Sequence, residues 1–294
     1  MKKSVVLATL AIVAGGFLAS CPTWPATAVF HSSWLASPDL QVLRHKGGPA
    51  NASKYTIHAS SPSCANPAPG QATRCGELEQ QILATTARLE WHLWVKNDDG
   101  SGYTNVARSV GHATIKQGRY LVTHNHPGML GSDLKNGQYI TVSVFSANGR
   151  PVWLEVPLSL LSTVANEPGT WVIQFGNYTG RGPFDTPGLA SAEFKAWEAI
   201  PLQPGMEVAQ IDWDGATAHI DWVIVERVLT QGAPPRLEMA NFAEEGASGG
   251  GVFWNGYHIA NTWYQATELD ARRGAVLRQY SVAALNSSEV AAHP

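Results

Sequence analysis

The chain has 294 residues, of which 44% are hydrophobic and 15% charged, and its formal net charge is −3. This length supports one large domain or two small ones, each with a substantial core. The weak negative charge gives no basic surface, so nucleic acid is not expected as a partner. The many glycines, prolines and tryptophans indicate frequent turns and few long helices, which favours an all-β fold.

The first twenty residues have the pattern of an export signal. Two lysines precede residues 4–19, which are apolar or small throughout and too few to span a membrane as a helix. Residues 18–21, Leu-Ala-Ser-Cys, resemble the bacterial lipobox, in which the cysteine thiol is acylated. We therefore expect residues 1–20 to be a signal peptide and Cys21 to attach the exported chain to membrane lipid. Ordinary cleavage nearby, for example after Ala26, is the alternative.

The next segment has little periodicity. Residues 21–75 are rich in Pro, Ser, Ala and Asn, which indicates a tether or a loosely ordered segment. Within it, Cys64 and Cys75 form an even pair that predicts a disulfide in an oxidising compartment, with two free thiols as the alternative. No cysteine has a histidine at metal-ligand spacing, so neither a metal nor another cofactor is expected. A short helix is predicted at about residues 77–87, because its apolar residues fall on one side.

Two motifs stand out in the β-rich remainder. The first is the apolar run 120–123, which ends in Thr-His-Asn-His at residues 123–126 and would hold a histidine rigidly at a strand end. The second is Gly-Ala-Ser-Gly-Gly-Gly at residues 246–251, just before an apolar run. Glycines permit positive φ and close approach of a substrate, and they allow two amide N–H groups to point at one oxygen. This pattern predicts a nucleophile loop around Ser248.

Together the two motifs resemble those of the chymotrypsin-like (trypsin-like) serine peptidases, in which Thr-x-x-His carries the base and Gly-x-Ser-Gly-Gly the nucleophile. The resemblance implies an all-β peptidase domain of two six-stranded antiparallel β-barrels, preceded by the short helix. The implied boundaries are 76–285 for the domain, about 86–192 for barrel one, about 199–285 for barrel two and 286–294 for a C-terminal tail.

The resemblance also assigns roles by position. His126 would be the general base, Ser248 the nucleophile, and the N–H groups of Gly246 and Ser248 the oxyanion hole. The acid that orients the base is less clear. Order and spacing favour Asp185, which precedes an apparent inter-barrel linker, whereas taking residues 171–175 as the following strand favours Glu167. The remaining candidate aspartates fit the spacing worse: Asp133, Asp212, Asp214 and Asp221.

The substrate pocket follows from the same alignment. The strand after the Asn255-Gly256 turn would pair with substrate backbone, which implicates three residues: Asn261, Thr262 and Trp263. Phe242, six residues before the serine, would form the base of the pocket. Because no carboxylate stands there, a preference for Arg or Lys is not indicated, and a shallow apolar pocket is expected.

The resemblance, together with the export signal, therefore implies an exported serine endopeptidase that acts on protein or peptide substrates at the cell membrane or outside it, and a monomer is expected. A catalytically inactive peptidase fold that acts as a binding module is the main alternative. A metal-dependent hydrolase using His124 and His126 is another, but the His-x-His-Pro pattern of the zinc isopeptidases fails here, because Leu134 and Gly137 replace its serine and aspartate. His-Asn-His nuclease spacing is also absent. A secreted β-sandwich without enzymatic role would leave the spacing of both motifs unexplained.

Overall fold

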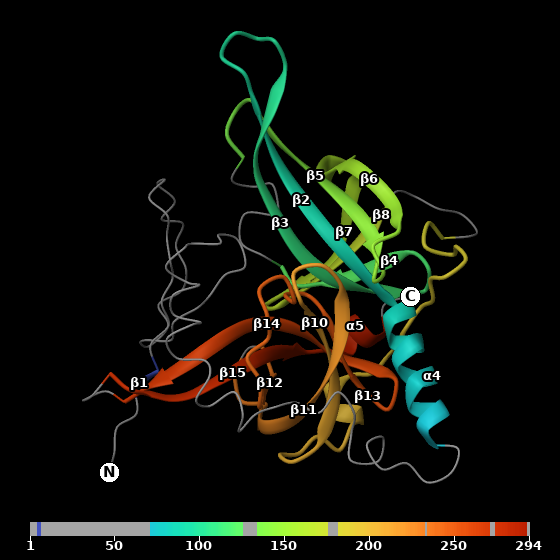
Figure 1. Ribbon diagram of the computed structural model, residues 1–294, viewed down its shortest axis with the longest axis vertical. Coiled ribbons are helices and arrows are strands. Elements are labelled where there is room, and N and C mark those ends of the chain that lie inside the picture. The colour runs from blue at the N-terminus through green and yellow to red at the C-terminus, as the bar shows by residue number, and fades with distance from the viewer. Residues whose placement is uncertain are drawn as a thin grey trace.

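The computed structural model describes residues 5–6, 71–125, 134–175, 182–232, 234–270 and 274–292, and these are almost entirely β (Figure 1). Two sheets account for most of them, one built from the first half of the chain and one mainly from the second, and their strands are antiparallel except for one short parallel pairing in the second sheet. The prediction of an all-β, chymotrypsin-like double-barrel fold is confirmed, with one difference in the closure of the first sheet.

The first sheet has seven strands in the order β6-β5-β2-β3-β4-β8-β7. Among the described residues its edge strands β6 and β7 do not pair with each other, so it forms a half-barrel where a closed six-stranded barrel was predicted. A 3₁₀ turn, Leu158–Leu160, joins these two edge strands. The strands are β2 (Thr86–Lys96), β3 (Tyr103–Lys116), β4 (Tyr120–Thr123), β5 (Gln138–Ser146), β6 (Pro151–Pro157), β7 (Leu161–Glu167) and β8 (Thr170–Phe175).

The second sheet closes on itself. Its order is β14-β13-β10-β11-β12-β15, and β14 also pairs with β15, which completes a six-stranded barrel. Two short strands, β1 (Val5–Val6) and β9 (Glu193–Phe194), add to β14, and a 3₁₀ turn, Trp197–Ala199, leads into the barrel. The barrel strands are β10 (Glu207–Trp213), β11 (Ala218–Leu229), β12 (Arg236–Met239), β13 (Gly251–Trp254), β14 (Tyr257–Leu269) and β15 (Val276–Leu285).

Local turn chemistry explains the hairpin that follows the serine. Asn255 and Gly256 both have positive φ, 49° and 81°, as a two-residue type I′ turn requires. The Asn-Gly pair in the sequence predicts this turn, and its twist matches that of the flanking strands. The turn therefore fixes the register of β13 against β14 and, with it, the position of the loop before β13.

Each sheet has its own apolar core, so the two sheets are separate packing units. The half-barrel core includes Leu89, Ile115, Leu121, Val142 and Ile173. The barrel core includes Val208, Val223, Leu237, Val252 and Ile259. Helix α4 (Gln71–Ala84) begins and ends earlier than the helix predicted at 77–87. Its buried Ile82 packs against the second barrel, beside Ile211 and Trp222.

The end of the described chain is tied to the first sheet. Residues 286–292, expected as a tail, include helix α5 (Ser288–Ala292), whose Val290 is completely buried. The Nζ atom of the buried Lys116 donates to the carbonyl oxygens of Val290 and Ala291, at 2.6 and 3.1 Å. Burial lowers the pKa of Lys116 to about 8. A cation at this end of a helix also complements the helix dipole.

Several predictions concern residues outside the described part of the chain. Cys21 and Cys64 lie there, as does most of the segment 21–75, and Cys75 falls within α4. The signal peptide, the lipid attachment and the disulfide therefore stay predictions. Among the described residues, no helix combines the length and apolar character needed to cross a membrane.

Candidate active site

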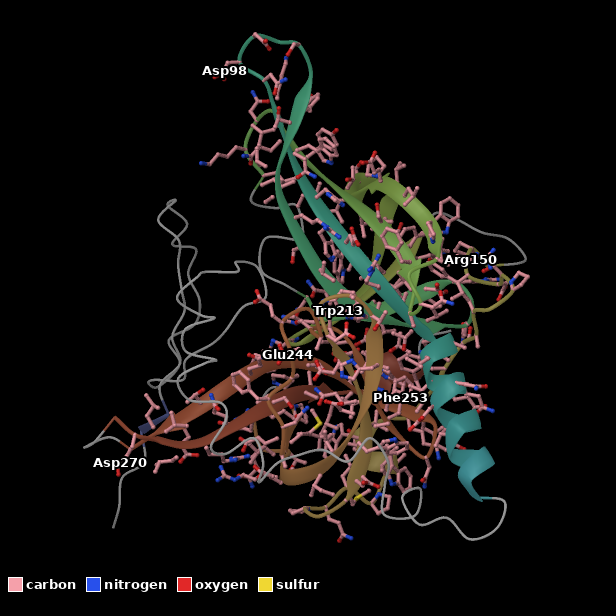
Figure 2. The ribbon with its side chains drawn as sticks, in the orientation of Figure 1. Asp98, Arg150, Trp213, Glu244, Phe253 and Asp270 are labelled. Atoms are coloured by element: carbon pink, nitrogen blue, oxygen red, sulfur yellow. The ribbon has the colours of Figure 1, made fainter. Side chains whose placement is uncertain are left out.

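Ser248 lies just before β13, where the two sheets meet. Its carbonyl oxygen accepts a hydrogen bond from the backbone N–H of His112 on β3, at 2.8 Å. The next amide, that of Gly249, donates to the carbonyl oxygen of Thr262 on β14, at 2.7 Å. Figure 2 shows Trp213 and Glu244, which flank this loop, close to the junction of the half-barrel and the barrel. The serine is therefore held by backbone bonds to both sheets.

Gly249 brings the serine loop directly against the strand end that precedes His126. Its φ is +79°. A Cβ there would lie 2.2 Å from Thr123 Oγ1, 2.3 Å from the His112 carbonyl oxygen and 3.0 Å from the backbone nitrogen of His124. Only glycine fits so close a contact. The two sequence motifs thus meet in space. His126 itself lies outside the described residues, so its role as the base stays a prediction.

The loop contains two backbone amides without an acceptor among the described residues. Gly246 has φ +100°, and a Cβ on it would lie 2.6 Å from Cδ1 of Trp213. Within the described chain, the N–H groups of Gly246 and Ser248 have no hydrogen-bond acceptor. These are the two amides that the sequence predicts for the oxyanion hole. The partly exposed Ser248 hydroxyl points at the Trp263 carbonyl oxygen, 3.4 Å away.

His112 orients the Gly246 peptide, a role that the sequence reasoning missed. The side chain is completely buried, and its Nδ1 lies 2.8 Å from the Gly246 carbonyl oxygen. Because a carbonyl oxygen only accepts, Nδ1 must carry the proton, which fixes the tautomer. Burial lowers the pKa of His112 to about 4, so the ring is neutral at pH 7. The ring also packs on Trp213, with centroids 5.3 Å apart.

Asp212 supports the same loop from the second barrel. Its Oδ1 accepts hydrogen bonds from the backbone N–H groups of Trp213, at 2.8 Å, and Glu244, at 2.7 Å. The Glu244 carbonyl oxygen then accepts the Ala247 N–H at 3.1 Å. The sequence marked Asp212 only as a poorly spaced candidate for the catalytic acid. Its position indicates a different role, that of fixing the turn that presents Ser248.

The structure does not bring Asp185 to the serine. The Asp185 carboxylate accepts the Gly182 N–H at 2.7 Å, and a Cβ on Gly118 would lie 2.0 Å from its Oδ1. Gly118 is in the turn at the start of β4, whereas Thr123 ends that strand. Three residue steps of extended strand separate the two ends by roughly 10 Å. The position of Asp185 therefore does not favour it as the acid that orients His126.

Glu167 lies nearer to the histidine-bearing strand end. Its carbonyl oxygen accepts from Nδ2 of Asn125 at 2.7 Å, and the Oδ1 of Asn125 accepts the Gly169 N–H at 3.0 Å. Its carboxylate Oε1 accepts the Ser287 hydroxyl at 2.7 Å. Of the two acids that the sequence left open, Glu167 is therefore the one beside the residue that precedes His126.

The predicted pocket residues divide into two groups. Asn261 and Thr262 are buried: Nδ2 of Asn261 donates to Thr170 Oγ1 at 3.2 Å, and Thr262 Oγ1 accepts from Nε2 of Gln210 at 2.9 Å. Trp263 and Phe242 are partly exposed. Trp263 packs edge-on against the ring of His124. Only this second group can contact a ligand directly without rearrangement.

Comparisons with known proteins add little beyond the fold. No protein-family model matches the chain, and no curated protein matches it in sequence. Among solved structures it is similar to the HtrA-type protease AlgW, solved with a decapeptide, at 15% identity and a TM-score of 0.48, over 71% of this chain and 62% of that one. It is also similar to Deg5, at 15% identity and a TM-score of 0.47, over 67% of this chain and 87% of that one.

A further similar structure is an inactive form of Rv3671c from M. tuberculosis H37Rv, at 12% identity and a TM-score of 0.43, over 74% of this chain and 92% of that one. The chain spans less than two thirds of the length of the first of these structures. At such identities the likeness concerns the fold alone, and the fold class stands on the strand order of the two sheets.

Proposed function

We propose that the protein is an exported serine endopeptidase that hydrolyses peptide bonds through an acyl-enzyme intermediate on Ser248. The observation that carries the proposal is the contact between the serine loop and the strand end at Thr123 and His124, two residues before His126. The two amides of the same loop that have no acceptor among the described residues support it, because acyl transfer needs donors for the oxyanion of its tetrahedral intermediate.

In the proposed reaction His126 accepts the proton of the Ser248 hydroxyl while Oγ attacks the scissile carbonyl carbon. The N–H groups of Gly246 and Ser248 stabilise the oxyanion, and His126 then donates its proton to the leaving amine. Water, activated by the same histidine, hydrolyses the ester and regenerates the serine. His112 and Asp212 do not touch the substrate in this scheme, since they hold the loop that carries both donors.

The remaining features belong to the same proposal. The substrate is a protein or peptide, with Trp263 and Phe242 at the pocket. Export through residues 1–20, lipid attachment at Cys21 and a Cys64–Cys75 disulfide would place a monomeric enzyme at the outer face of a membrane or beyond it. No metal or organic cofactor takes part in the bond-forming and bond-breaking steps of this scheme.

Covalent labelling tests the proposal. The chain without residues 1–21 would be treated with a fluorophosphonate probe, alongside Ser248→Ala and His126→Ala, with His124→Ala as the matched histidine control. We expect labelling of the parent and of His124→Ala, and none of the other two variants. Labelling that survives His126→Ala but not His124→Ala would contradict the assigned base, and labelling that survives Ser248→Ala would contradict the nucleophile.

A catalytically inactive binding module is the second candidate, and two observations favour it. The carboxylate of Asp185 is held at the far end of β4, and the Ser248 hydroxyl is directed at a backbone carbonyl. A folded chain that is never labelled, and that binds peptide equally well as the wild type and as Ser248→Ala, would establish this function in place of the first.

A further inference from the structure

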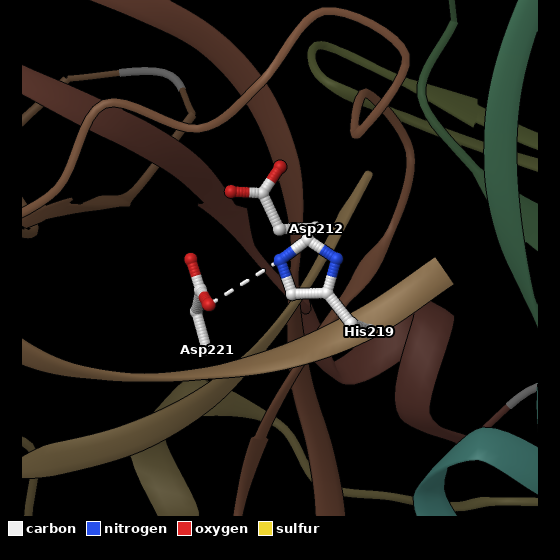
Figure 3. A group of neighbouring side chains, drawn as sticks. All are labelled: Asp212, His219 and Asp221. Carbon is white, nitrogen blue, oxygen red and sulfur yellow. Dashed lines mark ion pairs between the residues drawn. The ribbon is translucent and has the colours of Figure 1, made fainter. Parts of the chain in front are cut away.

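Three side chains that the proposed reaction does not use gather on one face of the β10–β11 hairpin: Asp212, His219 and Asp221 (Figure 3). Asp212 and His219 are cross-strand partners, and Asp221 is two residues further along β11. Side chains at such positions project from the same face of a sheet. Nε2 of His219 lies 3.4 Å from Oδ1 of Asp221, and one potential ligand atom from each residue lies within 4.8 Å of the others.

This spacing is close to that of a metal site. A cation with Zn–N and Zn–O distances of about 2.0–2.2 Å holds neighbouring ligand atoms roughly 3–3.5 Å apart. Small side-chain movements would therefore bring the three groups into contact with one ion. The hairpin that carries them is well defined, because Oδ1 of Asp214 accepts the N–H groups of Ala216 and Thr217 at the turn.

The cluster also contains two carboxylates but only one basic side chain. Asp212 is only 3% exposed, and the carboxylate of Asp221 lies close to it. In the described part of the chain, His219 is the only basic side chain within ion-pair distance of Asp221, and Asp212 has none. Two adjacent carboxylates of this kind need a shared proton or a cation between them.

We propose that Asp212, His219 and Asp221 bind a divalent cation of the Zn²⁺ type, and that the bound ion braces the loop that carries Ser248. One imidazole nitrogen and two carboxylates are a donor set suited to Zn²⁺, with room for water or a further ligand. The ion would supply the positive charge that the cluster lacks.

The link to the loop runs through Asp212. Its Oδ1 already accepts the Glu244 N–H at 2.7 Å, and the Glu244 carbonyl oxygen accepts the N–H of Ala247, the residue before Ser248. A cation bound to Asp212 would restrain the side chain that accepts this N–H, and so would restrain the loop. Ion binding itself is independent of the proposed peptidase function, whereas any effect of the ion on catalysis rests on it.

Calorimetric titration with Zn²⁺ tests the site. The chain without residues 1–21 would be compared with His219→Gln and Asp221→Asn, whose side chains are partly exposed and do not support the Glu244 N–H. His92→Gln is the matched control, because His92 lies 3.9 Å from Glu90 in a similar pair on the other sheet. We expect one equivalent of bound Zn²⁺ that weakens at least tenfold in both cluster variants and is unchanged in the control. Absence of binding by the folded chain, or equal binding by His219→Gln, would overturn the site.

Hydrogen exchange tests whether the bound ion stabilises the Ser248 loop. Zn²⁺ should slow exchange of the Glu244 and Ala247 amides at least tenfold in the parent and in Ser248→Ala, and leave it unchanged in His219→Gln. Equal exchange with and without bound Zn²⁺ in the parent would overturn the proposed stabilisation of the loop. Because Ser248→Ala binds and responds normally in this scheme, failure of the peptidase proposal would show in the labelling experiment and leave the metal result intact.

Discussion

The closed barrel and the half-barrel contribute to the candidate site in different ways. The closed barrel holds the Ser248 loop through Asp212 and Thr262, and it places Trp213 beneath Gly246. The half-barrel supplies a strand end and one buried histidine, while the predicted acid Asp185 lies at the other end of β4. The difference shows that contacts from both sheets fix the Ser248 loop directly, whereas the position of a candidate acid depends on where a long connecting segment delivers one side chain.

Loss of the contact between the two sheets at Gly249 should lower the free energy of unfolding more than any other change proposed. In Gly249→Ala, the new methyl group would overlap Thr123 Oγ1 and the His112 carbonyl oxygen. The alanine backbone would also have to adopt a positive φ. Overpacking and the φ penalty together predict a loss of about 2–5 kcal/mol in the free energy of unfolding. Urea denaturation of the purified chain would measure it.

The control for that variant is Gly149→Ala. Gly149 has nearly the same φ, +81°, but no atom lies within 4 Å of a Cβ built there. Gly149→Ala should therefore show only the conformational part of the loss, about 1–2 kcal/mol. Equal losses in the two variants would mean that the serine loop does not press against the half-barrel as described.

The second largest effect is a pH dependence of stability, which originates in His112 of the half-barrel. An unperturbed histidine titrates near pH 6.5, and burial lowers the pKa of His112 to about 4. Between these two pH values the unfolded chain takes up a proton that the folded chain does not, so stability falls as the pH is lowered from about 6.5 to 4. At about 1.4 kcal/mol for each pKa unit, the loss from this group is about 3 kcal/mol.

Urea denaturation at pH 7 and at pH 4.5 would measure this loss, with His112→Phe as the comparison. The variant should lose less stability than the parent over the same range. His258, whose pKa burial lowers to about 3, acts in the same direction in both proteins and so cancels in the difference. An identical pH dependence in the two proteins would contradict the burial of a neutral His112.

His112→Phe also tests whether the half-barrel orients the oxyanion loop. The phenyl ring fills much of the same space but cannot donate to the Gly246 carbonyl oxygen. A buried acceptor left without its donor costs about 1–3 kcal/mol, and if that cost falls on the active loop, labelling by fluorophosphonate slows about tenfold or more. His258→Phe is the control, because His258 is equally buried but its Nδ1 faces Nδ2 of Asn286 and not the Gly246 carbonyl oxygen. Equal labelling rates in the two variants would exclude the orienting role.

The sequence predicts the Ser248 loop and its hairpin better than it predicts the position of the acid. Positive φ at Gly246, Gly249 and the Asn255-Gly256 turn is a local property of glycine-rich segments, so the loop and its hairpin follow from the residues themselves. The position of Asp185 depends instead on the path of the chain between β8 and β9, which spacing does not determine.

His112 and Asp212 show the other limit of sequence reasoning. Both lie in strands whose alternating pattern gives no sign that a polar side chain is buried, and their partners Gly246 and Glu244 are far along the chain. Their roles arise from tertiary contacts alone. A buried polar residue beside a motif is a signal only once the burial is known.

The smallest effect is expected for Asp185→Asn, and it separates the two acids most clearly. An asparagine can still accept the Gly182 N–H, and the side chain lies at the end of β4 remote from Ser248, so the labelling rate should stay within about twofold of the parent. Removing a true orienting acid lowers the rate of acyl transfer by about 10⁴ in enzymes of the Ser-His-Asp type. Glu167→Gln is the informative partner, because Glu167 lies beside Asn125 at the other end of the same strand. A large loss in Glu167→Gln with none in Asp185→Asn would identify Glu167 as the acid, whereas a large loss in Asp185→Asn would require the segment after β8 to reach the opposite end of β4.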